Sequence, residues 1–94
     1  MKIVESKQFK DELKAIAYYI RRDNLSASVE FVQTLKKKIK HLADSPYQYR
    51  KSVYFHHDNI RDMIYKGYTI VYEIDSEEKR LELLSIFNQN LPDL

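Results

Sequence analysis

The sequence predicts an α+β fold of two layers, in which a helical hairpin packs on one face of an antiparallel sheet. Apolar residues recur at helical spacing in the first half of the chain and alternate as in strands in the second half. The only glycine, Gly67, lies between two alternating runs, where a hairpin turn is expected. Neither half can bury its apolar surface alone, so the helices must cover the sheet. The predicted order is β-α-α-β-β-β, with the opposite face of the sheet open to a partner.

The first half begins with a short strand and a helix. Ile3 and Val4 lie between charged residues and predict the strand. Ser6 offers a side-chain oxygen that caps the helix after it. This helix should end within residues 21–24, where Asp and Asn favour a turn and a new cap. Its apolar stripe consists of Phe9, Leu13, Ile16, Ala17 and Ile20.

A second helix is expected from near Ser26 to a point before Pro46. Proline lacks the amide hydrogen and disfavours helical geometry at the residue before it. The apolar face of this helix consists of Phe31, Val32, Leu35, Ile39 and Leu42. The short connection between the two helices predicts an antiparallel hairpin.

Three strands are predicted in the second half. Residues 60–65 and 68–74 alternate on either side of the Lys66-Gly67 turn, where Gly67 can take a positive φ. Residues 75–79 form a charged turn, and residues 80–88 form a buried final strand. The stretch 48–55 is either a loop or a short strand.

The alternation within residues 68–74 sorts the side chains into two sets. Tyr68, Ile70, Tyr72 and Ile74 point one way, and Thr69, Val71 and Glu73 point the other. The sheet half also holds Tyr54 and Tyr65. Its tyrosines either pack as ordinary strand residues or form a stacking surface for bases or a protein partner.

Composition indicates one domain over residues 1–94, because a chain of this length supports one modest core. The absence of cysteine excludes disulfides, thiolate metal sites and cysteine nucleophiles. The charged N-terminus does not resemble a signal peptide, and the longest apolar run, Ala15–Ile20, is too short to cross a membrane. We therefore expect a soluble cytoplasmic protein without a membrane partner.

The net charge is only +2, but the charges are clustered. The basic cluster consists of Lys36, Lys37, Lys38, Lys40, Arg50 and Lys51. The acidic cluster consists of Asp75, Glu77, Glu78 and Glu82. The basic cluster is either a solvated helix face or a surface for nucleic acid or an acidic partner.

Arg61 and the pair His56-His57 are the candidates for chemistry. Arg61 either holds a carboxylate or phosphate with two bonds, or pairs with Asp62 or an acid on the next strand. Adjacent strand residues face opposite ways and no second ligand set is spaced for a metal, so no metal site is predicted. The histidines are either exposed loop residues or an acid–base pair. With one glycine, no phosphate loop or nucleophile elbow is possible, and no cofactor is expected.

Five sequence features occur together in one order. They are Phe9 and Leu13 in the first helix, Ala43-Asp44-Ser45-Pro46, Asn59-Ile60-Arg61-Asp62, Gly67-Tyr68-Thr69-Ile70-Val71-Tyr72, and the closing strand Leu83 to Phe87. Through them the chain resembles the RelE/ParE superfamily of toxins over nearly its full length. The resemblance implies the same β-α-α-β-β-β fold and an antitoxin partner that wraps the toxin. It implies one of two activities: cleavage of messenger RNA on the ribosome, or poisoning of DNA gyrase by binding.

The resemblance also favours one activity. RelE-like members carry a basic residue where this chain has Thr69, and basic residues near the C-terminus where it has Asn88-Gln89-Asn90. The loss of two cations would cost several kcal/mol, at about 3 kcal/mol per donor, in a phosphodiester transition state. We therefore expect a ParE-like toxin that binds gyrase, with growth inhibition and plasmid stabilization as cellular roles.

Two alternatives remain. The first is a ribosome-dependent endoribonuclease, in which Arg61, Lys51 and Lys66 hold phosphate and His56 or His57 is the base. The second is a non-toxic homologue that only binds its antitoxin. The candidates for contact with a target or an antitoxin are Arg50, Lys51, Arg61, Lys66, Tyr65, Asn88 and Asn90.

Overall fold

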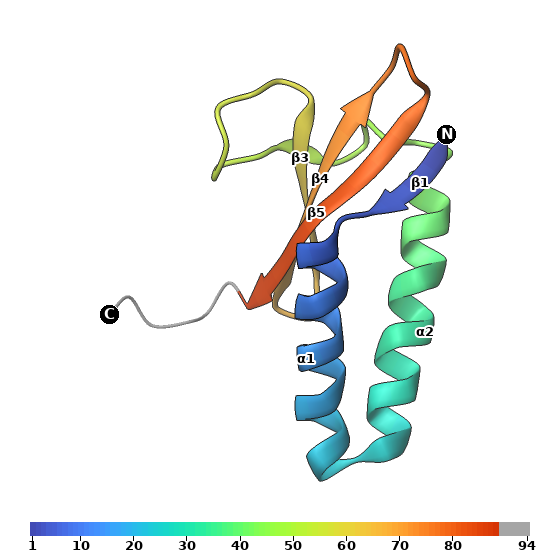
Figure 1. Cartoon of the computed structure of the whole chain (residues 1–94), viewed down its shortest axis with the longest axis vertical. Coiled ribbons are helices and arrows are strands. Elements are labelled where there is room, and N and C mark those ends of the chain that lie inside the picture. Colours follow the sequence, from blue (N-terminus) through green and yellow to red (C-terminus); the bar gives the residue numbers. More distant parts are fainter. Residues whose placement is uncertain (89–94) are drawn as a thin grey trace.

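A computed structural model describes residues 1–88 of the chain. It contains β1 (Lys2–Glu5), α1 (Lys7–Asp23), α2 (Leu25–Leu42), β2 (Arg50–Lys51), β3 (Ile60–Tyr65), β4 (Tyr68–Asp75) and β5 (Arg80–Asn88). The helices pack on a five-stranded sheet (Figure 1), so the predicted α+β class and layer arrangement are confirmed. Of the open alternatives for residues 48–55, a two-residue strand is present. Neither described helix is apolar enough over its length to cross a bilayer.

The sheet has the order β1-β5-β4-β3-β2 and is mixed rather than fully antiparallel. β1 pairs with β5 in parallel, from Lys2 opposite Arg80 to Glu5 opposite Leu83. All other neighbouring strands are antiparallel. The expectation of an antiparallel sheet is thus wrong at this edge. The chain passes through Ser6 from β1 into α1, which packs along β5 beyond the residues that pair with β1.

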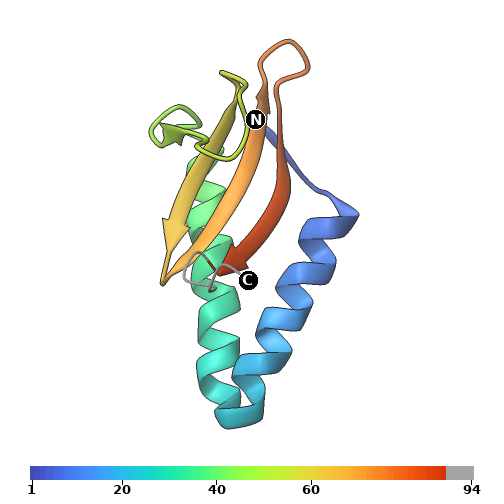
Figure 2. The same ribbon diagram turned by 90° about the vertical axis from the view of Figure 1, so that its left-hand side faces the viewer.

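Side-chain caps define both helices. The Ser6 hydroxyl accepts a hydrogen bond from the amide of Phe9 (3.0 Å), which confirms the predicted cap. The Asn24 side chain accepts one from the amide of Ala27 (3.0 Å), so α2 begins at Leu25, one residue before the expected start. Only Asn24 separates the two helices. Figures 1 and 2 show that their connected ends extend past the sheet, so no strand of the described residues covers the tip of the hairpin.

The core lies between the helical hairpin and one face of the sheet. Its fully buried residues include Phe9, Leu35, Leu42, Met63, Ile70, Tyr72, Ile74, Leu81, Leu83 and Ile86. The Phe31 ring lies 5.1 Å from the ring of Tyr65 and 5.3 Å from that of Tyr68. These aromatic contacts join the middle of α2 to the β3–β4 hairpin. The apolar stripes predicted for both helices therefore face the core, with Ile16, Ile20 and Val32 at its margin.

Glu12 on α1 completes the edge of β5 that β1 leaves unpaired. Its Oε1 atom accepts hydrogen bonds from the Ser85 hydroxyl (2.7 Å) and the Ile86 amide (3.2 Å). β1 pairs only with residues 80–83, so the later part of β5 would otherwise present free amides. The Glu12 carboxylate therefore supplies a hydrogen-bond acceptor to β5 beyond the residues that pair with β1.

The far face, meaning the sheet face turned away from the helices, is not fully open. Thr69 and Val71, which the alternation places on the side opposite to Ile70, are both fully buried. The segment 52–59 covers part of it: the Tyr54 ring packs edge-on against Phe87 at 5.1 Å, and the Val53 amide donates to Asp62 (3.0 Å). The prediction of an open far face is therefore wrong in this region, because residues 52–59 fold back over the sheet.

Tyr72 offers a test of how the chain after α2 is anchored. Its hydroxyl donates to the carbonyl of Pro46 (2.7 Å), and burial raises its pKa well above the usual value. Above pH ~10 the unfolded chain loses this proton while the folded chain keeps it, so stability falls as pH rises, by at most about 1.4 kcal/mol per pH unit. Tyr72→Phe should remove this part of the pH dependence and cost about 1 kcal/mol at neutral pH.

Urea unfolding at pH 7 and pH 11 measures both effects. Tyr19→Phe is the matched control, because Tyr19 is 64% exposed. The assignment fails if Tyr72→Phe and the parent lose the same free energy between the two pH values.

A second test concerns the β5 edge. Glu12→Ala leaves the Ile86 amide without its acceptor, so we expect a loss of 1–3 kcal/mol (about the cost of an unsatisfied buried donor) in urea unfolding. Asp11→Ala removes an exposed ion pair with Lys7 on the same helix and should cost less than about 1 kcal/mol. Equal losses in the two variants would contradict the edge-capping role.

Candidate functional site

The structure divides the predicted site residues between two ends of the sheet. Arg61 lies near the start of β3 and Lys66 lies just after its end. They are five positions apart along an extended strand, about 17 Å at 3.4 Å per residue, so they cannot hold the same phosphate. The loop end holds Arg50, Lys51, His56, His57 and Arg61, and the turn end holds Tyr65, Lys66 and Asn88. Asn90 lies outside the described residues.

Arg61 holds the segment between α2 and β2. Its Nη1 atom donates to the carbonyls of Tyr49 (3.0 Å) and Tyr47 (3.5 Å), and its guanidinium carbon lies 5.2 Å from the Tyr47 ring centre. Within residues 1–88, its Nε is buried without a hydrogen-bond partner. The guanidinium is therefore engaged by the chain itself. Among the described residues, Arg61 forms no ion pair with Asp62 or with an acid on the next strand. The guanidinium of Arg61 instead contacts two backbone carbonyls and the Tyr47 ring.

Asp62, the neighbour of Arg61, is buried beneath the loop on the far face. One carboxylate oxygen accepts from the Val53 amide, and the Arg50 guanidinium lies 3.6 Å from the same oxygen. Arg50 is half exposed, so its charge is shared between Asp62 and solvent. Arg50 remains available to a partner, but moving it would leave a buried carboxylate with less compensation.

The two loop histidines line a shallow hollow of about 320 Å³ with Lys51 and Asp58. Lys51 pairs with Asp58 at 3.3 Å. The Nδ1 atom of His57 accepts the Asn59 amide (3.2 Å), so its proton is on Nε2 when the ring is neutral. Within residues 1–88 no group of three His, Cys, Asp or Glu side chains could hold a metal ion. The hollow can contact an anion through Lys51 and the imidazoles.

The turn end presents a cation beside buried aromatic rings. The Tyr65 ring is 5% exposed, and its hydroxyl lies 3.4 Å from the carbonyl of Phe31. The ammonium groups of Lys38 and Lys66 lie 5.8 and 5.7 Å from its ring centre. Of the predicted contacts here, Lys66 is exposed and Tyr65 is not. Lys66 also has φ 48°, a conformation that costs a lysine free energy.

Beside this turn lies an apolar groove that the sequence did not predict. It has a volume of about 480 Å³ and is lined by Glu12, Ala15, Ile16, Tyr19, Tyr68, Ile86, Phe87 and Asn88. Asn88, a predicted contact residue, is at its rim. Tyr19 was missed, although an exposed tyrosine on the polar side of a helix is a usable signal. This groove can take an apolar side chain of a protein partner.

The far face shows little that would stabilise a phosphodiester transition state near Thr69. Thr69 pairs with Ile64 on one side and with Phe87 on the other, and Tyr54 packs on Phe87. A transition state that gains negative charge requires donors or cations aimed at it. The described residues around Thr69 supply apolar surface instead.

Comparisons with known proteins agree with this geometry. A sequence profile described as "ParE toxin of type II toxin-antitoxin system, parDE" matches residues 3–90. The chromosomal ParDE system of P. aeruginosa superposes with TM-score 0.73 at 15% identity, covering 94% of this chain and 95% of that one. The isolated RelE toxin of E. coli gives 0.67 at 16% identity, covering 98% and 87%. The intact RelBE toxin–antitoxin complex of E. coli gives 0.59 at 16% identity, covering 92% and 97%.

The structural likenesses are at low identity and establish the fold alone. No curated protein sequence matches this chain. The profile spans most of the chain, from residue 3 to residue 90. The chain therefore belongs to the ParE toxin family of type II toxin–antitoxin systems, within the RelE/ParE superfamily.

Proposed function

We propose that this protein is a toxin that acts by binding and inhibiting a target, DNA gyrase, and that a cognate antitoxin neutralises it. One observation carries the choice of binding over cleavage. The sheet position at which RNA-cleaving members carry a cation is Thr69, which is buried between strands bearing Ile64 and Phe87. Without a cation there, the transition state of RNA cleavage loses about 3 kcal/mol of electrostatic stabilisation.

The antitoxin part of the proposal draws on the relatives. Two of the similar structures are named as a ParDE toxin–antitoxin system and an intact RelBE toxin–antitoxin complex. This chain matches a profile of the same class of toxin. It also exposes Tyr18, Tyr19, Leu25 and Val29 on its helices, which is apolar area that a protein partner would cover.

A RelE-type endoribonuclease is the second candidate. It is favoured by the hollow that brings His56, His57 and Lys51 together. It is weakened by Arg61, whose guanidinium is bound to the carbonyls of Tyr47 and Tyr49. A third possibility is a homologue that binds its antitoxin and is not toxic.

Expression without the antitoxin tests the proposal. We expect growth to stop, with DNA synthesis failing before protein synthesis in pulse-labelled cells. The purified protein should inhibit gyrase supercoiling, because the proposed action needs only binding. Replacement of His56 and His57 by alanine should leave the arrest within twofold, since no catalytic base is required.

Three outcomes would contradict it. Normal growth on induction identifies a non-toxic homologue. New messenger RNA ends in a translation extract, lost when both histidines are replaced, identify an endoribonuclease. Growth arrest with unaffected gyrase points to another target.

Lys66 provides a test of the turn end as a target contact. Lys66→Gly removes the cation while relieving the positive φ, so stability should stay within about 1 kcal/mol of the parent. If Lys66 contacts the target, survival on induction should rise at least tenfold. Colony counts and urea unfolding measure the two effects.

Lys79→Gly is the matched control, because Lys79 has φ 51° in the other hairpin turn. It should keep full toxicity. Similar survival for the two variants would show that the turn end is not a specific contact.

A further inference from the structure

The structure divides the basic cluster predicted from the sequence into two parts. At the loop end, Arg50 and Lys51 face the carboxylates of Asp62 and Asp58. The other part lies in the second half of α2, where every lysine is exposed and none forms an ion pair within the described chain, 1–88. The fold therefore leaves the charges of this second part without a neutralising acid. Its members are Lys36, Lys37, Lys38 and Lys40.

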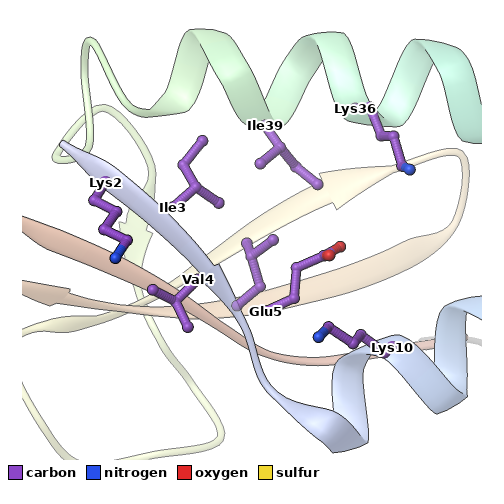
Figure 3. A pocket seen from close by; sticks show the side chains of 8 residues that line it. Lys2, Ile3, Val4, Glu5, Lys10, Lys36 and Ile39 are labelled. Carbon is purple, nitrogen blue, oxygen red and sulfur yellow. The ribbon is translucent and has the colours of Figure 1, made fainter.

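The lysines of α2 spread around its outward side. Lys36 lies on the flank towards β1, where it lines a hollow of about 550 Å³ (Figure 3). Lys38 lies on the opposite flank, where its ammonium group is 5.8 Å from the ring centre of Tyr65 on β3. Lys37 and Lys40 lie between the two flanks, because successive residues turn by about 100° around a helix axis. Positive charge thus covers the full width of the helix.

A fifth cation joins these lysines from the β3–β4 turn. The ammonium group of Lys66 lies 5.7 Å from the Tyr65 ring centre, beside which Lys38 also lies. Between Glu30 and Asp44 the sequence has no acidic residue, so the α2 part carries no opposing charge. We call the five exposed lysines together the basic face: Lys36, Lys37, Lys38, Lys40 and Lys66.

Helix stability accounts for only part of this charge. A cation in the last turn interacts favourably with the helix dipole, which explains Lys40 in a helix that ends at Leu42. The effect falls off within that turn, so it does not extend to residues 36–38. Lys36 and Lys40 are also four positions apart, and like charges at this spacing destabilise a helix. An anionic partner would relieve this repulsion.

We propose that the basic face binds the phosphate backbone of duplex DNA without reading its sequence. This goes beyond the proposed function, in which the toxin contacts the gyrase protein. Lysine contacts to phosphates supply affinity that does not depend on sequence. A helix with its side chains is about 10–12 Å across, and the major groove of B-form DNA is about 12 Å wide. Lys36 and Lys38, on opposite flanks of α2, can therefore each approach one of the two phosphate strands.

Other anionic partners fit the basic face less well. Among the described residues, none of the well-exposed large apolar side chains lies between residues 30 and 46. Protein interfaces depend on apolar and aromatic anchors, and helices at a membrane surface insert apolar residues, so an acidic protein or a lipid surface lacks its main contact here. Interfaces with DNA are more polar and more positively charged.

The other forms of nucleic acid are also less suited. A single strand stacks its bases on exposed rings, whereas the Tyr65 ring beside Lys38 and Lys66 is only 5% exposed. The major groove of an RNA duplex is deep and narrow, so it does not match the width of α2. Duplex DNA is the partner that requires cations across a helix and no exposed ring.

Titration of the purified protein against DNA tests the basic face. The probe is a dye-labelled 20-base-pair DNA duplex, followed by fluorescence anisotropy in 50 mM salt and at higher salt. Lys37→Gln/Lys40→Gln should weaken binding at least tenfold. It should also flatten the slope of log K against log salt by about 1.8, at about 0.9 per lost phosphate contact. Both side chains are exposed, so the substitutions leave the core intact.

The matched control is Lys7→Gln/Lys79→Gln, which removes the same charge at exposed positions outside the basic face. It should bind within twofold of the parent and keep the salt slope of the parent. Equal loss in the two double variants overturns the proposal, as does absence of parent binding at 0.1 mM protein. Tighter binding of a single strand of the same sequence, of an RNA duplex or of a polyglutamate peptide also overturns it.

The titration contains neither gyrase nor an antitoxin, so its result is independent of the proposed function. A protein that arrests growth but does not bind the duplex keeps the proposed toxicity and overturns the DNA-binding role of the basic face. A protein that binds the duplex through Lys37 and Lys40 but leaves growth normal supports the basic face and contradicts the toxicity.

Discussion

The fold depends on β5 as the strand on which the two ends of the chain meet. β5 pairs with β4 on one side and with β1 on the other, and α1 packs along it. Ser6 makes this junction: its amide donates to the carbonyl of Leu83, its hydroxyl donates to that of Leu84, and its oxygen caps α1 at Phe9. Until β5 is in place, β1 has no strand to pair with and α1 loses the strand on which it packs, because residues nearly 80 positions apart must pair.

The polar residues that were most prominent in the sequence turn out to hold the chain together. Arg61 and Tyr72 are cross-strand partners, and they donate to the carbonyls of Tyr47, Tyr49 and Pro46 in the segment that leads from α2 to β2. On the far face, Asp62 holds the following loop through the Val53 amide. A charged residue within a strand therefore acts here on its own backbone, where charge-assisted hydrogen bonds are stronger than neutral ones.

The surfaces that remain accessible to partners are suited to binding rather than to catalysis. The loop end offers the accessible cations Arg50 and Lys51 and two imidazoles, and the turn end offers Lys66 beside an apolar groove. The hollows along α1 and α2 add apolar side chains with lysines beside them. Apolar grooves rimmed by charge are typical of protein recognition. This agrees with a toxin that works through contacts, and it leaves separate surfaces for a target and a neutralising partner.

The sequence by itself determined the elements, because helix periodicity, the Ser6 cap and the Gly67 turn are local. It also revealed the resemblance to the RelE/ParE superfamily and showed that Thr69 stands where RelE-like members carry a basic residue. Only the tertiary structure decided that β1 runs parallel to β5 and that segment 52–59 covers part of the far face. It likewise decided what Arg61 binds and where the grooves lie, since these depend on residues distant in sequence that meet only when the layers assemble.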